Sequence, residues 1–256
     1  MAPSAPTVEG MLRAGMFGIR RASLLLGVTL LGAASGCVAE VRSCDLKTDE
    51  IVMWATLTDS DAGVEVEIEF AVGDSEGAAI ALCPERDRLE VNGTEATVIR
   101  ALGLLFYTVK FEEPQGSYEI VLARNGGQSV TTLVEPPPAF EIVEPALDST
   151  HPRSAPLTVS WTPEWSGGMV DLAVEDAIGS DCIEGLGVYY QLEDTGSFII
   201  GGNSLVSGRA DPENSLGCAV TVSLSRSASV DYPAAFHEGG SISAYVRRRR
   251  PFTSVE

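Results

Sequence analysis

Apolar and polar residues alternate one by one along much of the chain, which is typical of strands with one buried and one solvent-facing side. The run Val64-Glu65-Val66-Glu67-Ile68-Glu69-Phe70 alternates without a break, and residues 157–161 and 220–224 do the same. Shorter alternating segments lie at residues 51–57, 107–111, 118–122, 170–174 and 242–246. We therefore expect strands at all of these positions.

Polar, glycine-rich segments separate these runs at intervals of about 8–12 residues, as turns do in sandwich proteins. Examples are Asn92-Gly93 and Ser166-Gly167-Gly168. After the first forty residues, no window keeps the 3.6-residue period of a helix. The pattern predicts an all-β chain built from antiparallel β-sandwiches.

The first forty residues follow a different pattern. Ile19-Arg20-Arg21 supplies positive charge, and the uncharged segment Ala22–Ala34 follows it. This segment is too short for a membrane-spanning helix, which needs about 20 residues, but it has the length of a signal-peptide core. Met16, or Met11, would start a leader of ordinary proportions.

The leader ends in Ala34-Ser35-Gly36-Cys37, which resembles the lipobox of bacterial lipoproteins. The resemblance implies that residues 1–36 are a cleaved signal peptide and that the Cys37 thiol carries diacylglycerol. Residues 37–47 would be a lipidated tether. Because Val38 and not Asp follows the cysteine, the resemblance further implies the outer membrane. An ordinary secretory signal that ends near a cysteine is the alternative.

Besides Cys37, the chain contains Cys44, Cys83, Cys182 and Cys218. An even number of cysteines in an exported protein favours disulfides, and four cysteines allow three pairings. We favour Cys44–Cys83 and Cys182–Cys218, because each bond then stays within one proposed domain. Four buried free thiols are the alternative. No CxxC motif occurs, which disfavours redox catalysis.

Three consecutive prolines, Pro136-Pro137-Pro138, mark the clearest boundary, since they cannot continue a sheet and favour a stiff extended spacer. We expect a first β-sandwich domain at residues 48–134, a linker at residues 135–139 and a second domain at residues 140–256.

The three prolines, the segment Phe140-Glu141-Ile142 and residues 157–163 (LTVSWTP) together resemble the opening of a fibronectin type III or related immunoglobulin-like domain. The resemblance implies that Trp161 is a core residue between two sheets. Tyr245 is the candidate for the family's tyrosine corner. The fold class is thus two immunoglobulin-like antiparallel β-sandwich domains after a lipoprotein signal peptide.

Composition excludes several functions. With 45% hydrophobic and 21% charged residues among 256, the chain has the composition of a folded protein. Acidic residues outnumber Lys and Arg by 36 to 17, and the resulting charge of −19 argues against nucleic acid as a partner. Two histidines and five cysteines offer little material for a zinc site, and we expect no cofactor.

Two short motifs could carry chemistry. Residues 73–77 (GDSEG) match the G-x-S-x-G elbow of hydrolases, which requires a helix after the serine and a nearby histidine, either His151 or His237. A polar turn is the simpler interpretation. Asp59 and Asp61 are spaced like calcium ligands but lack the rest of a calcium loop, so they are weak metal candidates beside an ordinary acidic turn.

The run Arg247-Arg248-Arg249-Arg250 stands out in an acidic second half. If the strand at residues 242–246 continues, alternate arginines point to opposite faces. The run is either a solubilising terminal strand whose arginines pair with carboxylates, or a site for an anionic partner such as lipopolysaccharide phosphates or an acidic protein.

The two resemblances together imply an outer-membrane-anchored lipoprotein, on the periplasmic face or the cell surface, that acts as a non-catalytic binding or structural module. Its partners would be the membrane, through the lipid, and an unknown envelope protein or polysaccharide. The alternatives are an envelope-associated hydrolase or a calcium-dependent adhesion module.

Overall fold

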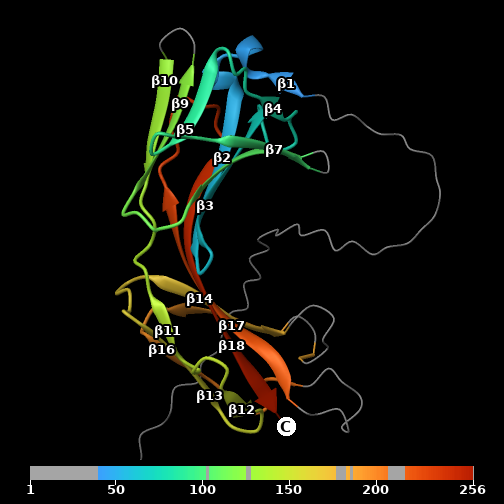
Figure 1. Cartoon of the computed structure of the whole chain (residues 1–256), viewed down its shortest axis with the longest axis vertical. Helices are drawn as coiled ribbons and strands as arrows, with labels where there is room; N and C mark the ends of the chain where they lie inside the picture. The colour runs from blue at the N-terminus through green and yellow to red at the C-terminus, as the bar shows by residue number, and fades with distance from the viewer. Residues whose placement is uncertain are drawn as a thin grey trace, which may run out of the picture. The chain divides into compact units, whose positions relative to one another are not determined.

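Strands make up nearly all of the folded chain, as the alternating pattern predicts (Figure 1). The computed structural model describes residues 40–101, 104–124, 128–176, 183–184, 187–206 and 217–255. Within these ranges the helical elements are two 3-10 turns, η1 at Ser43–Asp45 and η2 at Thr48–Glu50. No helix in these ranges is long and apolar enough to cross a membrane. The all-β fold class is confirmed.

A first hydrophobic core is enclosed by the inward-facing side chains of two sheets. One side is formed by part of a nine-stranded sheet: β2 (Ile51–Ser60), β3 (Gly63–Val72), β8 (Leu104–Phe111) and β7 (Thr97–Ala101). The other side is a four-stranded sheet in the order β10 (Gln128–Val134), β9 (Tyr118–Arg124), β5 (Asp87–Val91) and β6 (Thr94–Glu95). A short parallel pair, β1 (Val41–Arg42) with β4 (Ile80–Ala81), lies beside them.

A second core has the same two-sheet construction. Its smaller sheet has the order β11 (Glu141–Glu144), β13 (Leu157–Thr162) and β16 (Ser197–Ile200). Its larger sheet is the rest of the nine-stranded sheet: β15 (Val188–Glu193), β14 (Met169–Asp176), β17 (Cys218–Val230) and β18 (Ser241–Val255), with β12 (Thr150–Pro152) beside the end of β18. Trp161 is 3% exposed in this core, as the resemblance implied.

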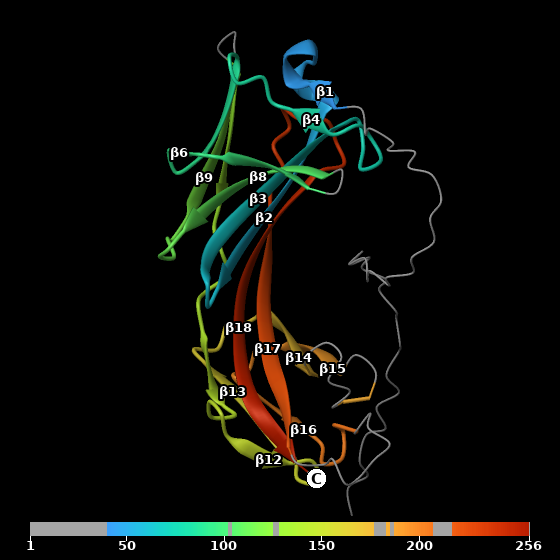
Figure 2. The same ribbon diagram turned by 45° about the vertical axis from the view of Figure 1, so that its right-hand side comes forward.

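The antiparallel hairpin of β17 and β18 belongs to both cores (Figure 2). These strands have 13 and 15 residues, whereas strands in globular proteins usually have about 3–10. Val222 and Phe252 pack in the second core, while Ile242 and Ala244 pack in the first. The loop between the strands adds Phe236 to the first core.

Two features differ from the expectations. The sheets are not purely antiparallel, because β18 pairs in parallel with β2 over residues 241–246 and with β12 over residues 253–255. In addition, residues 236–244, expected in the second domain, contribute to the first core. The alternating pattern indicates which side of a strand is buried, but it does not identify the strand's neighbours or their direction.

The tyrosine-corner candidate is also placed differently. Tyr245 is half-buried on the outward side of β18, beneath the guanidinium group of Arg247. Tyr118, at the start of β9 in the first core, instead makes the contact typical of a tyrosine corner, since its hydroxyl accepts a hydrogen bond from the Gln115 backbone N–H at 2.8 Å.

Candidate functional site

The four consecutive arginines divide by position along β18. Val246 and Phe252, which flank the run, are buried in the second core, and Arg248 and Arg250 share their side of the strand. Arg247 and Arg249 point to the opposite, outward side and are exposed. The run therefore contains two structural and two solvent-facing arginines.

Arg248 is held by the two aspartates proposed as weak calcium ligands. Its Nη1 donates a hydrogen bond to the buried Asp59 carboxylate at 3.0 Å, and its Nε lies 3.9 Å from an Asp61 carboxylate oxygen. The other Asp61 oxygen accepts a hydrogen bond from the Arg249 backbone N–H at 3.0 Å. The Arg248 guanidinium group thus occupies the space beside both carboxylates in which a calcium ion would have to bind.

Arg250 also has an internal partner, because its Nη2 donates a hydrogen bond to the backbone carbonyl of Ile142 in β11. This contact joins the larger sheet of the second core to the smaller one. The expectation that the arginines pair with carboxylates is met by Arg248, whereas Arg250 binds a backbone carbonyl.

The outward arginines have different surroundings. The Arg247 guanidinium carbon lies 4.8 Å from the centre of the Tyr245 ring, a cation–π distance. The β17 residues opposite Arg247 and Arg249 are Ser225 and Ser223. Within the described ranges, neither outward guanidinium lies within 4.0 Å of a carboxylate, and neither serine hydroxyl has a hydrogen-bond partner.

Two acidic side chains lie farther along this outward face. Asp171 is opposite Ser225 on β14, and its pKa is raised by burial although the charge of Arg247 opposes that effect. Glu175 accepts a hydrogen bond from the Tyr189 hydroxyl at 3.0 Å. Burial and this contact raise the pKa of Tyr189 to about 12.

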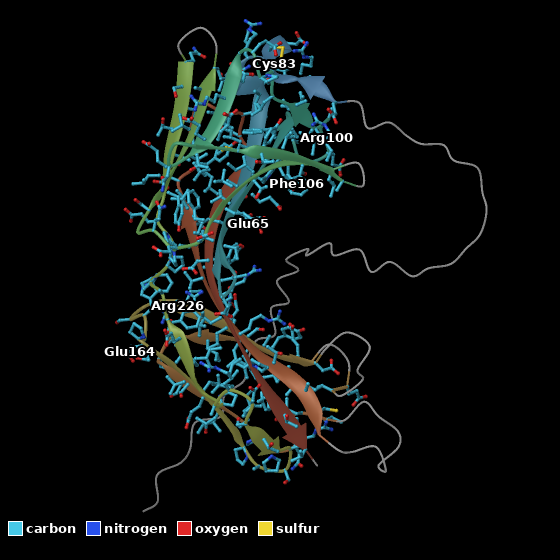
Figure 3. All side chains as sticks on the ribbon, in the orientation of Figure 1. Glu65, Cys83, Arg100, Phe106, Glu164 and Arg226 are labelled. Carbon is cyan, nitrogen blue, oxygen red and sulfur yellow. A yellow bond between two sulfur atoms is a disulfide. The ribbon has the colours of Figure 1, made fainter. Side chains whose placement is uncertain are left out.

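The first half of the same sheet presents an acidic outward face on β3, formed by Glu65, which is labelled in Figure 3, and by Glu67 and Glu69. Glu65 pairs with Lys110 at 3.2 Å. Burial raises the pKa of both Glu67 and Glu69, and in each case the preceding glutamate of the row adds to the effect.

The sequence analysis missed a buried ion pair in the second core. Arg226, labelled in Figure 3, and Asp194 both have fully buried side chains, and Nε donates to the carboxylate at 2.6 Å. The second oxygen of Asp194 accepts a hydrogen bond from the Trp161 indole N–H at 2.7 Å. The remaining Arg226 nitrogens donate to the carbonyls of Pro138 and Pro163 at 2.7 and 2.5 Å.

A signal for this pair was present in the sequence. Val220, Val222 and Leu224 occupy alternate inward positions of β17, and continuing their alternation places residue 226 inward as well. A buried charge requires a counter-ion, so an inward arginine predicts a buried acid nearby. The alternation alone does not identify Asp194, which lies 32 residues away in the chain.

The predicted Cys44–Cys83 disulfide is present and joins η1 to the segment after β4. Glu85 lies close to both sulfurs, but bonded sulfurs are not thiolate ligands for a metal. Cys218 is also disulfide-bonded. Cys182, its expected partner, and the lipidation candidate Cys37 lie outside the described residues, so these two assignments stay predictions.

The hydrolase motif lacks the required framework. After Ser75 the chain continues into β4, and no helix follows the turn in the described chain. The histidine rings make hydrogen bonds elsewhere, His151 with the carbonyl of Ala155 and His237 with that of Glu238. The structure therefore does not assemble a nucleophile elbow at residues 73–77.

No protein-family model matches the chain, and no curated protein matches it. Among solved structures, the crystal structure of DIP-gamma IG1+IG2 matches 82% of this chain and 99% of its own, with 9% identity and a TM-score of 0.21. The crystal structure of Dpr11 IG1 bound to DIP-gamma IG+IG2 matches 81% and 98%, with the same identity and TM-score. Both are described as containing IG domains. At this identity and TM-score, neither match bears on what this chain binds.

Proposed function

We propose that this protein is an outer-membrane lipoprotein, anchored through Cys37, that acts as a non-catalytic binding module of the cell envelope. The observation that carries the anchor is the order of charged, apolar and small residues that ends at Cys37. The Cys44–Cys83 bond supports export, since disulfides persist in oxidising compartments.

The binding role is supported by the composition of the described chain. Two sheet-enclosed cores account for nearly all of its buried apolar residues, and its candidate nucleophile Ser75 has neither the helix nor the histidine that hydrolysis requires. Binding through exposed sheet faces and loops needs neither of these.

The two-domain division at residues 135–139 is part of the proposal, with the β17–β18 hairpin shared between the domains. It is supported by the two residues that flank the linker, because Val134 packs in the first core and Phe140 in the second.

The anchor is tested by Cys37→Ser in the full chain, with metabolic labelling by a fatty acid and fractionation of membranes. We expect the variant to lose the label and to leave the outer-membrane fraction. Cys44→Ser is the matched control, because it removes a cysteine of the disulfide and should keep the label. Labelling that persists in Cys37→Ser contradicts the lipoprotein assignment.

A further inference from the structure

The outward face of the β17–β18 hairpin differs from the rest of this acidic protein. It presents the guanidinium groups of Arg247 and Arg249, with the hydroxyls of Ser225 and Ser223 directly across the strand pair. Residues on the same side of one strand lie about 6.6 Å apart, and side chains opposite each other on paired strands about 5 Å apart. Four hydrogen-bond donors are therefore gathered on a small area.

These donors are free to act on a ligand. In the described part of the chain, the two outward guanidinium groups have no carboxylate in ion-pair contact, whereas Arg248 has Asp59 and Asp61. Arg247 is also positioned by the Tyr245 ring beneath it. A positioned side chain loses less conformational freedom when it binds.

We propose that Arg247, Arg249, Ser223 and Ser225 form a binding site for the phosphate groups of a linear polymer. This inference deepens the proposed binding function by naming a site and a ligand class. A guanidinium can bind two oxygens of one phosphate, and the tetrahedral phosphate directs oxygens toward the adjacent serine as well. A carboxylate has only two oxygens, which lie in one plane and are both used by a bidentate arginine.

The shape of the ligand follows from the charges on the neighbouring strands. Tyr245 of β18 is opposite Thr58 of β2, which is opposite Glu65 of β3, so the glutamate row lies two strands away on the same face of the sheet. A flat anionic membrane surface would meet this row and be repelled. On the other side, Asp171 of β14 lies opposite Ser225. A narrow polymer running along β18 contacts the arginines between these two acidic borders and avoids the glutamates.

The test uses the full chain in non-ionic detergent and a fluorescently labelled inorganic polyphosphate, with binding measured by anisotropy. We expect R247Q/R249Q to weaken binding about tenfold or more, since each arginine supplies charge-assisted hydrogen bonds. R248Q, set against the single variant R247Q, is the matched control, because it removes one positive charge from the inward side of β18 as R247Q does from the outward side. It should lower the melting temperature and leave the affinity within about twofold.

Three further measurements complete the design. S223A/S225A should weaken polyphosphate binding, and the parent protein should bind poly-glutamate of equal charge less tightly than polyphosphate. Binding of polyphosphate should weaken as salt rises. Equal loss in R247Q/R249Q and R248Q, or equal affinity for the two polymers, would overturn the phosphate site.

The membrane alternative is tested by competition. Both neutral and anionic phospholipid vesicles take up an acyl anchor, so the neutral vesicles are the control. If only the anionic vesicles displace polyphosphate from the protein, the assignment to a linear polymer is overturned. Because the polyphosphate measurement needs no anchor, its failure is distinguishable from a failure of Cys37 acylation.

Discussion

In the first core, Arg124 and Asp87 lie near the rim with 9% and 2% of their side chains exposed, whereas Arg226 and Asp194 in the second core are both fully buried. Both arginines bind backbone carbonyls as well as an aspartate. Arg124 holds the carbonyls of Ser43 and Leu46 in the N-terminal segment, which the disulfide also holds.

Arg226 holds two other segments. It binds the carbonyl of Pro138 in the linker and that of Pro163 after β13, and its guanidinium carbon lies 4.6 Å from the centre of the Phe140 ring. The comparison shows two ways of attaching a neighbouring segment to a sandwich. The first core combines a covalent bond with a rim ion pair, and in the second core a fully desolvated arginine holds the neighbouring segments.

The largest effect is expected for Arg226→Met. This change leaves the Asp194 carboxylate buried with the Trp161 indole as its remaining partner, and breaking a buried pair on one side costs about 3–5 kcal/mol. Urea unfolding followed by tryptophan fluorescence measures the loss. The double variant Arg226→Met with Asp194→Leu removes both charges and should recover most of it. If Arg226→Met lowers the free energy of unfolding less than Arg124→Met does, the comparison between the two cores is contradicted.

The disulfide comes next. Cys44→Ala with Cys83→Ala opens a cross-link over 39 sequence positions, and we expect a loss of about 2–4 kcal/mol in the free energy of unfolding. The measurement is urea unfolding of the variant and of the parent, with and without reductant. Reductant also opens the Cys218 bond in both proteins, so the stability difference between parent and variant should disappear when both are measured in reductant.

Arg124→Met should lower the free energy of unfolding by about 2 kcal/mol, which is less than the loss expected for Arg226→Met. Asp87 keeps the hydrogen bond from the Ser43 hydroxyl, and water can reach the rim to solvate the carbonyls that Arg124 leaves. Combined with the disulfide variant, the change should cost less than the sum of the single losses, because each contact helps to hold the segment on which the other depends. Simple additivity would show that the two contacts act independently.

The smallest effect concerns the outward acidic face. Because the pKa of Glu67 is raised in the folded state, the folded protein binds protons more readily than the unfolded chain, and its free energy of unfolding increases as the pH falls through that pKa. Glu67→Gln should therefore stabilise the protein by up to about 0.5 kcal/mol at pH 7. The gain should vanish below the ordinary glutamate pKa of 4.5. Thermal melts across this range measure it, with Glu113→Gln as an exposed control.

The local elements were predictable from the sequence because the two-residue period is a local property. Every segment in which apolar and polar residues alternate lies within a strand, and Trp161 is buried as expected. The parallel pairing of β18 with β2 was not predictable, because residues 241–246 and 54–59 meet only through tertiary packing.

The candidate site was predictable in part for the same reason. Alternation predicted that the four arginines divide between two faces of β18, and the structure adds which pair faces the core. The partners Asp59 and Ile142 are contributed by other strands, 189 and 108 residues away, so no local pattern could identify them.

The shared hairpin also determines when the molecule can complete its fold. Residues 241–255 are synthesised after every other described strand, yet β18 supplies Ile242 and Ala244 to the first core and Phe252 to the second. Residues 40–134 are therefore synthesised with one edge of β2 unpaired. The strand that pairs with this edge, β18, follows β2 by almost two hundred residues. In many multidomain proteins the N-terminal domain folds first during synthesis. Here neither core is complete before β18 has been synthesised, so the folding of both halves depends on the same late step.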